Sequence, residues 1–270
     1  MRDPFDPRVL QRLRHARRIA VLSGAGISAE SGIPTFRDAQ TGLWSRFRPE
    51  ELATPDAFRR NPQLVWDWYE WRRGLVARAE PNAGHRALAQ MEALVPALTL
   101  ITQNVDGLHQ RAGSRTVIEL HGNIWRNKCF AEGLVVETEP LPAAQPATRA
   151  GPPSADAEEP GSATPRADPP RCLRCGAYLR PDVVWFGETL PAEALADAET
   201  AARECDVFFS IGTSAVVFPA AQLPVSALQS GAAVIEINKD ATPLTAVATF
   251  SLRGEAGTVL PRLISAAWGE

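Results

Sequence analysis

SGAGISAESGIPTFRD, residues 23–38, is the stretch that decides the fold of this 270-residue chain. The apolar run IAVL at residues 19–22 stands just before it and has the length of a buried strand. Gly24 and Gly26 then form a G-x-G turn, where missing Cβ atoms let backbone N–H groups approach a pyrophosphate. Ala29 replaces the third glycine of a G-x-G-x-x-G dinucleotide fingerprint, which is a permitted small substitute. Alone, the turn favours a dinucleotide site no more than it favours an ordinary loop.

Short apolar runs alternate with helical patterns along the chain. Runs of strand length occur at residues 98–101, 207–211 and 233–237, and amphipathic helical patterns occur at 54–79 and 85–94. Such alternation favours a parallel sheet with helices on both faces. We therefore predict an α/β fold, with a doubly wound, Rossmann-like parallel sheet and a second, smaller domain made of a helical part and a cysteine-bearing part.

The expected domain boundaries follow the motifs and a change in composition. The Rossmann-like domain is expected to comprise residues 1–38, 82–125 and 183–270. The helical part of the small domain is expected at 39–81, and the cysteine-bearing module at 126–182. Within that module, residues 137–170 contain many Pro, Ala, Gly, Ser and acidic residues and almost no large apolar side chain, so they cannot offset their ordering entropy. We interpret this segment as a disordered insertion, with a partner-binding tail as the alternative.

Composition narrows the class of protein. A net charge of -3 and a pI near 5.9 argue against a general nucleic-acid binder, and no apolar stretch approaches the roughly 20 residues that span a bilayer. The first residues show no apolar core of the kind that a secretory signal has. Although they are Arg-rich, Asp6 and Pro7 stand in helix-starting positions, so we expect a structural helix rather than a targeting segment. Four cysteines, two of them in one C-x-x-C, suit a metal site in a cytoplasmic protein better than disulfides.

Two further segments accompany the G-x-G stretch: TQNVDGLH at residues 102–109, and His121-Gly122. Together the three resemble the sirtuins, the NAD-consuming protein deacylases, over about residues 10–265 apart from the insertion. The resemblance implies NAD as co-substrate, acyl-lysine proteins or peptides as partners, and transfer of the acyl group to ADP-ribose. The NAD-binding residues that it implies are Gly24, Ala25, Gly26, Ser28, Phe36, Arg37, Gln103, Asn104, Asp106, Gly212, Thr213, Ser214, Asn238 and Ala256.

The resemblance also assigns the catalytic groups. Asn104 and Asp106 would contact the nicotinamide ribose and carboxamide, and they follow an apolar run at the strand end where α/β sheets bind ligands. His121 would be the general base, because a neutral imidazole can take a proton from a ribose hydroxyl near pH 7. Phe36 would shield the ribose carbon from water, while Arg37 would help to hold the cofactor.

Tyr69 and Arg72 lie three residues apart in WDWYEWRR, and so on one face of the expected helix. This Tyr-x-x-Arg pair resembles the sirtuin subclass that removes malonyl and succinyl groups, which end in a carboxylate that an arginine fork and a tyrosine hydroxyl can bind. Ala53 resembles the small residue that leaves room for the longer acyl chain. An ordinary amphipathic helix with a half-buried tyrosine and a solvated arginine is the alternative. The resemblance further implies that a strand holding Val184, Phe186 and Gly187 pairs with the substrate peptide.

The metal-binding pattern departs from the family. Sirtuins usually hold a structural zinc between two C-x-x-C pairs, and here Cys172 and Cys175 form one pair, whereas Glu132 replaces the second cysteine of the pair that begins at Cys129. Three thiolates with Glu132 or a water could bind zinc, since a carboxylate is an acceptable fourth ligand. A module held by packing without zinc is the alternative. Cys205 is interpreted as structural.

The sequence therefore predicts an NAD-dependent lysine deacylase that prefers malonyl and succinyl groups over acetyl. Two other functions remain compatible with it. One is ADP-ribosyl transfer or NAD hydrolysis on the same scaffold. The other is a non-catalytic NAD or ADP-ribose sensor, against which the presence of His121, Asn104 and Asp106 argues.

Overall fold

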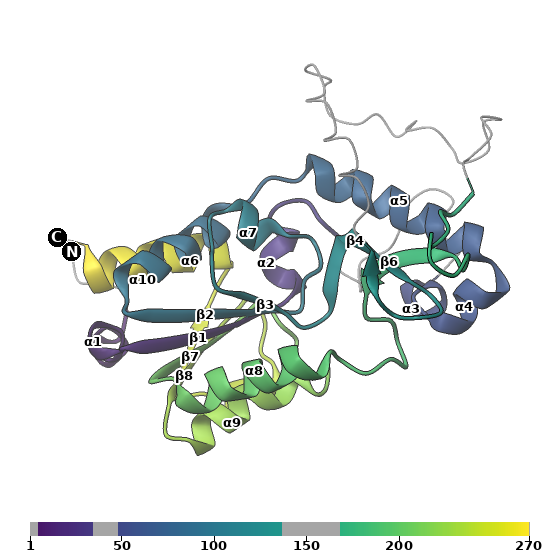
Figure 1. Ribbon diagram of the computed structural model, residues 1–270. Coiled ribbons are helices and arrows are strands. Elements are labelled where there is room, and N and C mark those ends of the chain that lie inside the picture. Colours follow the sequence, from purple (N-terminus) through teal and green to yellow (C-terminus); the bar gives the residue numbers. More distant parts are fainter. Residues whose placement is uncertain (1–4, 35–47, 137–167, 270) are drawn as a thin grey trace. The chain divides into compact units, whose positions relative to one another are not determined.

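The computed structural model of the chain describes residues 5–34, 48–136 and 168–269 (Figure 1). Phe36 and Arg37, together with most of the insertion expected at 137–170, lie outside the described residues. The chain divides into two compact units. The first comprises Met1–Thr35, Ala79–Gly122 and Thr189–Glu270, and the second comprises Phe36–Arg78 and Asn123–Glu188.

The first unit is built on a six-stranded sheet. Its strands are β1 Arg18–Ser23, β2 Ala97–Thr102, β3 Val117–Glu119, β7 Val207–Ile211, β8 Ala233–Asn238 and β9 Phe250–Arg253. In space their order is β3-β2-β1-β7-β8-β9, and each pair of neighbours is parallel. This is the 3-2-1-4-5-6 order of a doubly wound, dinucleotide-binding sheet. The predicted Rossmann-like fold is therefore confirmed.

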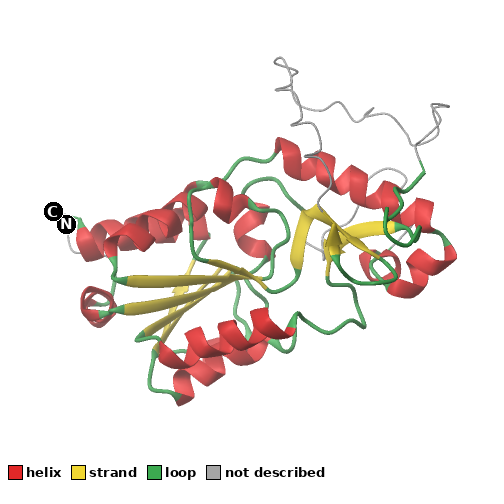
Figure 2. Ribbon diagram, viewed as in Figure 1, coloured by secondary structure: helices red, strands yellow, loops and turns green. Residues whose placement is uncertain are grey.

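Helices cover both faces of this sheet (Figure 2). The helices of the first unit are α1 Pro7–His15, α2 Ala25–Ala29, α6 Ala83–Leu94, α7 Leu108–Arg111, α8 Ala192–Glu204, α9 Leu223–Gln229 and α10 Ala256–Trp268, with 3-10 turns η2 Ala220–Gln222 and η3 Pro243–Ala246. Successive side chains of a strand point to opposite faces. Ile19 and Val21 accordingly pack with α1, α6 and α10, whereas Ala20 and Leu22 pack with α8 and α9. Within the described residues, no helix combines the length and the apolar character that crossing a membrane requires.

The starts of two of these helices follow from local sequence. The carboxylate of Asp6 accepts the N–H of Arg8 at 2.9 Å, and Pro7 occupies the first position of α1. The side chain of Asn82 accepts the N–H groups of Gly84 and His85 at the start of α6. Both caps satisfy backbone donors that a helix leaves without internal partners.

The second unit combines helices with a small sheet. Its helices are α3 Pro49–Leu52, α4 Pro55–Arg60 and α5 Pro62–Arg78, and its strands are β4 Gly122–Cys129, β5 Val135–Val136 and β6 Leu179–Val183, in the order β5-β4-β6. The single helical stretch expected at 54–79 is wrong in one respect, because the helix breaks at Asn61. Pro62 explains the break, since proline disfavours helical backbone at the preceding residue and lacks a donor.

Residues 184–188 form a turn, since β6 ends at Val183. The pairing of Val184, Phe186 and Gly187 with a substrate peptide stays a prediction. The turn belongs to the second unit, where Phe186 N donates to Ala53 O at 2.9 Å and Trp185 Nε1 donates to the Tyr69 hydroxyl at 2.8 Å. These contacts join segments that are far apart in sequence, which is why the local pattern does not reveal them.

Candidate active site

The candidate cofactor site of the first unit lies where strand order reverses. β1 stands between β2, which follows it by one crossover, and β7, which comes much later in the chain. Doubly wound sheets bind ligands at the carboxyl ends of the strands beside such a switch point, so the loops that follow β1, β2 and β7 are the candidates here. The three loops carry the G-x-G turn, the residues Gln103 and Asn104, and Gly212-Thr213-Ser214.

The glycines of the G-x-G turn have a structural role besides the one expected from the sequence. Gly24 N donates to Ile211 O at 3.0 Å, and Gly26 N donates to Gly212 O at 2.8 Å, so both donors serve the protein's own loops. A Cβ on Gly26 would stand 2.7 Å from the Cα of Gly212, and one on Gly212 would stand 2.6 Å from Ile27 N. These contacts leave no room for a side chain. The glycines therefore let the loops after β1 and β7 touch.

Asn104 and Asp106 are held on either side of Ser28. Asn104 Nδ2 donates to Ser28 Oγ and to Gly24 O, each at 3.0 Å. Ser28 Oγ in turn donates to Asp106 Oδ2 at 2.7 Å, while Asp106 Oδ1 accepts the N–H of Leu108 at the start of α7. Asp106 is buried. The first and second motifs thus form one hydrogen-bonded unit, and each side chain has a fixed orientation.

His121 is positioned as a neutral base. Its Nδ1 lies 3.2 Å from Gln103 O, and a carbonyl only accepts, so Nδ1 carries the hydrogen. In the neutral ring Nε2 is then the basic nitrogen. Burial lowers the pKa of His121 below its ordinary value, against a smaller opposing effect of the bond to Gln103. The imidazole is therefore uncharged and able to accept a proton at neutral pH.

A buried polar chain braces the loop that carries Gln103 and Asn104. His109 Nε2 lies 2.8 Å from Ser23 Oγ, which donates to Thr102 Oγ1 at 2.9 Å. Thr102 Oγ1 also accepts the N–H of Asn104 at 3.1 Å. Ser23 and Thr102 could not be singled out from the sequence, since each occupies a strand end in an apolar context. The chain makes His109 a structural residue beneath the loop.

Asn238 and Ala256, which the resemblance to sirtuins places at the adenosine end of NAD, lie within the first unit near other expected NAD-binding residues. Asn238 Nδ2 donates to Thr213 O at 2.8 Å, and Gln103 Nε2 donates to Thr213 Oγ1 at 3.1 Å. The N–H of Gly254 donates to Asn238 O at 3.1 Å, just before Ala256 begins α10. The ends of β2, β7, β8 and β9 therefore meet at one edge of the sheet.

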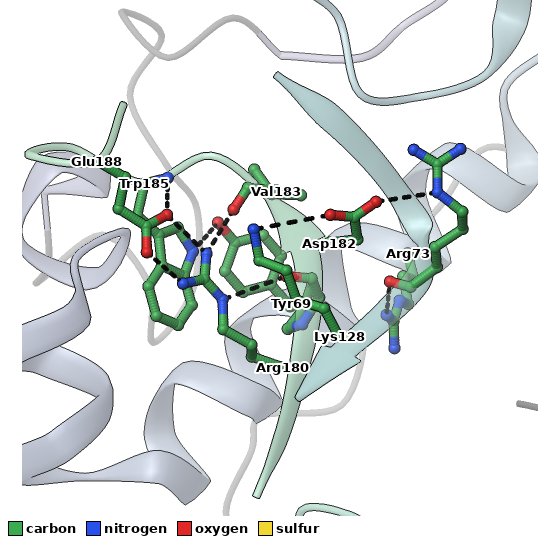
Figure 3. Close-up of polar contacts among 10 residues, drawn as sticks. Tyr69, Arg73, Lys128, Arg180, Asp182, Val183, Trp185 and Glu188 are labelled. Carbon is green, nitrogen blue, oxygen red and sulfur yellow. Dashed lines mark hydrogen bonds and ion pairs between the residues drawn. The ribbon is translucent and has the colours of Figure 1, made fainter. Parts of the chain in front are cut away.

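The Tyr69 and Arg72 pair lies in the second unit. Tyr69 is 1% exposed, and its hydroxyl accepts the indole N–H of Trp185 (Figure 3). Burial raises the pKa of Tyr69 to about 12, and the positive charge of Arg72 opposes that rise. The phenol is thus protonated at neutral pH, with the Arg72 charge nearby. The Arg72 guanidinium lies 5.1 Å from the ring centre of Trp68, which is a cation–π contact.

Arg180 fixes the turn that carries Phe186 and Gly187. Its guanidinium lies over the Trp185 ring and binds both carboxylate oxygens of Glu188, which also accepts the N–H of Trp185 at 2.8 Å (Figure 3). Arg180 is 3% exposed, whereas the side chain of Glu188 is 26% exposed, so the ion pair is only partly shielded from water. Arg180 could not be singled out from the sequence. Its partners, Val183 O and the Glu188 carboxylate, come within its reach only when the chain turns after β6. Val184 precedes the turn, and Phe186 is half-exposed at its tip.

The sulfur-rich cluster of the second unit brings the expected metal ligands together. The ligand atoms of Cys129, Glu132, Cys172 and Cys175 all lie within 4.8 Å of one another, and the sulfurs of Cys129 and Cys175 are 3.4 Å apart. Zinc bound tetrahedrally by thiolates at about 2.3 Å would hold sulfurs about 3.8 Å apart. The donor set therefore fits zinc, with Glu132 as the oxygen ligand. Glu132 also lies 3.6 Å from the guanidinium of Arg174, which would compete for its charge.

The residues of the first unit fit NAD. The carboxyl edge of the sheet supplies the imidazole of His121, the amide of Asn104 and the carboxylate of Asp106. It also supplies loops rich in Gly and Ser, which can approach a phosphate closely. If bound, NAD would be held by the loops after β1, β2, β7 and β8. Fold and site together define a doubly wound NAD-binding protein with a separate cysteine-bearing unit.

Comparison with known proteins agrees with this class. The model of the Sir2 family matches residues 24–219. An NAD-dependent protein deacylase of Aquifex aeolicus is 51% identical over 247 residues, which cover 91% of this chain and 93% of the relative. Another, from Methylococcus capsulatus, is 51% identical over 262 residues, which cover 97% of each chain. A crystal structure of a Sir2 homologue–NAD complex aligns with a TM-score of 0.83 at 46% identity, covering 97% of this chain and 94% of that one.

The chain belongs to the Sir2 family. This confirms the resemblance to the sirtuins and NAD as the cofactor that the site fits. The Tyr-x-x-Arg subclass and the roles of individual residues remain predictions.

Proposed function

We propose that the chain is an NAD-dependent protein-lysine deacylase that prefers malonyl and succinyl groups over acetyl, releasing nicotinamide and O-acyl-ADP-ribose. The relatives' names support deacylation, and one solved relative is described as Sir2 bound to an acetylated peptide, with a TM-score of 0.78 at 29% identity. The observation that carries the proposal is the neutral imidazole of His121, with Nδ1 bonded to Gln103 O and Nε2 as the basic nitrogen. We also infer a cytoplasmic location, supported by four cysteines that are all free of disulfide bonds.

When bound, NAD would supply a nicotinamide–ribose bond, with nicotinamide as the leaving group and the ribose carbon as the electrophile. His121 would accept a proton at Nε2 from a ribose hydroxyl, and the freed oxygen would take over the acyl group that leaves the lysine nitrogen. Asn104 and Asp106, fixed through Ser28, orient the ribose and carboxamide. Because these side chains are already hydrogen-bonded in place, binding costs little additional ordering.

Preference for acidic acyl groups rests on Tyr69 and Arg72. The protonated phenol can donate to a carboxylate oxygen, and the Arg72 charge acts on the same region, as its effect on the pKa of Tyr69 indicates. Burial excludes water from the hydroxyl, which strengthens a charge-assisted bond there. Ala53 is buried and small, and its carbonyl holds the turn at Phe186. An acetyl group offers no carboxylate to these donors, so it would gain nothing from them.

A panel of acyl-lysine peptides with NAD tests the proposal. We expect higher kcat/KM for succinyl- than for acetyl-lysine peptide, and we expect Arg72→Met to lower the succinyl value about 100-fold, as the loss of a bidentate charged contact would. The acetyl value should change little. Arg78→Met, which removes an exposed arginine from the last turn of the same helix, serves as the matched control.

The outcomes separate the alternatives. If Arg72→Met keeps its succinyl preference, the acyl specificity is wrong while deacylation stands. Ribosylated protein among the products would instead favour ADP-ribosyl transfer. Absence of nicotinamide release with every peptide would favour a sensor.

A further inference from the structure

Glu30, the residue directly after α2, makes a contact that links two distant parts of the first unit. Its carboxylate accepts the N–H of Gly257, at 2.9 Å to Oε2 and 3.2 Å to Oε1. Burial raises the pKa of Glu30, and hydrogen bonds from the N–H groups of Gly257 and Ala256 oppose that rise. The G-x-G turn leads directly into α2, and we call residues 24–30 the G-x-G loop. The end of this loop is thereby bonded to the first turn of α10.

The contact supplies what α10 lacks. The N-cap residue Glu255 makes no side-chain cap, and the first turn of α10 contains no acidic residue. The first N–H groups of a helix have no internal partner, and its positive end favours a carboxylate. Glu30 provides both from outside the helix. Burial is the largest influence on the Glu30 carboxyl and raises its pKa, so the backbone N–H groups hold the charge in place against desolvation.

Steric fit around this contact is close. A Cβ on Gly257 would stand 2.5 Å from Glu30 Oε2, and a Cβ on Gly84 would stand 3.1 Å from Gly257 N. Asn82, which caps α6 beside Gly84, also donates to Ile27 O at 2.7 Å and to Ser31 Oγ at 2.9 Å. The starts of α6 and α10 are thus both tied to the segment around Glu30.

An ion pair joins the same region to the end of β8. Lys239 Nζ lies 2.7 Å from Glu255 Oε1, and Lys239 directly follows Asn238. The Lys239 charge lowers the pKa of Glu30, whereas the Glu255 charge raises it, so the three groups lie close enough to interact. Loops after α2, after β8 and before α10 therefore share one charged cluster.

We propose that Glu30 is a positioning residue that sets the adenosine end of the cofactor site by holding the start of α10 against the G-x-G loop. This rests on the proposed function and on the NAD-binding roles that the resemblance to sirtuins implies for Ala256, Asn238 and the G-x-G turn. Glu30 acts through Ala256 and Gly257 and does not touch the reacting atoms. Its loss should therefore weaken binding of the nucleotide and leave the chemistry at His121 almost unchanged.

Glu92 offers a matched control within the same unit. Its carboxylate also accepts two backbone N–H groups, those of Arg115 and Thr116 at 2.8 and 3.0 Å, which lie 23 and 24 residues further along the chain. Glu92 holds the segment before β3 and contacts none of the residues in the Glu30 cluster that are described above. Removing either carboxylate lowers stability, but only Glu30 should affect nucleotide binding.

The test measures the Kd of ADP-ribose by calorimetry, Tm by thermal scanning, and the steady-state constants for NAD with a succinyl-lysine peptide. We expect Glu30→Ala to raise the Kd of ADP-ribose and the KM for NAD about tenfold, since small misplacements of binding groups cost this much, with kcat nearly unchanged. Glu92→Ala should lower Tm with an unchanged Kd. Glu30→Gln, which keeps an acceptor oxygen but no charge, should give an intermediate Kd.

Wild-type Kd in Glu30→Ala, or in Glu30→Gln if the alanine variant does not fold, overturns the inference while the proposed function stands. An equal rise in Kd for Glu92→Ala overturns it as well, because the effect would then be one of general stability. Wild-type protein that fails to bind ADP-ribose would overturn both the inference and the proposed function.

Discussion

Two buried histidines make the stability of the first unit depend on pH. The rings of His85 and His109 lie 4.8 Å apart between their centres, and both residues are at most 1% exposed. Burial lowers the pKa of His85 to about 4 and that of His109 to about 3. The charge of Arg86 adds to the effect on His85, and His85 adds to the effect on His109. Within the described residues, His85 Nε2 and His109 Nδ1 have no hydrogen-bond partner. Neither ring can therefore stabilise a positive charge.

The sign of the effect follows from these depressed values. In the unfolded chain each histidine takes up a proton near its ordinary pKa of 6.5, while in the folded protein it stays neutral down to about pH 4 or 3. Stability is complete above pH 6.5 and is lost as the pH falls below it. For each ring the free energy of unfolding falls by about 1.4 kcal/mol per pH unit in this window. For the pair it therefore falls by roughly 5 kcal/mol between pH 6.5 and 4.5. This loss is a large part of the total free energy of unfolding of a typical domain, which is about 5–15 kcal/mol.

Urea unfolding at several values of pH between 7 and 5 measures this cost. We expect the free energy of unfolding of His109→Asn to fall less steeply with decreasing pH than that of the wild type, by about 1.4 kcal/mol per unit. His15→Asn, which replaces an exposed histidine on α1, should keep the wild-type slope. Equal slopes for His109→Asn and the wild type would refute the reasoning.

Three further predictions concern the base, a glycine and the metal. Because burial lowers the pKa of His121, the acidic limb of the kcat/KM profile should have its midpoint below 6.5, and a midpoint above 6.5 would exclude a neutral buried base. Gly212→Ala, at φ +59 with its Cβ 2.6 Å from Ile27 N, should cost more than about 2 kcal/mol in urea unfolding, beyond the cost of Gly133→Ala at φ +70 in open space. Glu132→Cys should tighten zinc binding and Glu132→Ala should weaken it in competition with a chelator; equal affinities would show that Glu132 is no ligand.

The sequence predicted best what depends on local pattern. Apolar runs of strand length gave β1, β2, β7 and β8, and Asp6 with Pro7 gave the start of α1. The parallel direction of the strands followed from the alternation of strands and helices, because parallel strands need crossovers. The helix break at Asn61 was missed, although Pro62 signals it.

Contacts between distant segments could not be predicted in the same way. The close approach of Gly26 to Gly212, the bond between Trp185 and Tyr69, and the bond between Glu30 and Gly257 each join residues that no local period relates. The reason for the G-x-G turn was therefore only partly recognised. Its glycines make room for a neighbouring loop, which a single motif cannot reveal.

The products of a succinyl-lysine peptide and NAD give the most direct test of the account. Mass spectrometry should detect free nicotinamide and succinylated ADP-ribose in equal amounts, together with unmodified lysine peptide. Release of free succinate while NAD remains intact would contradict an NAD-consuming transfer, and with it the roles of His121, Asn104 and Asp106.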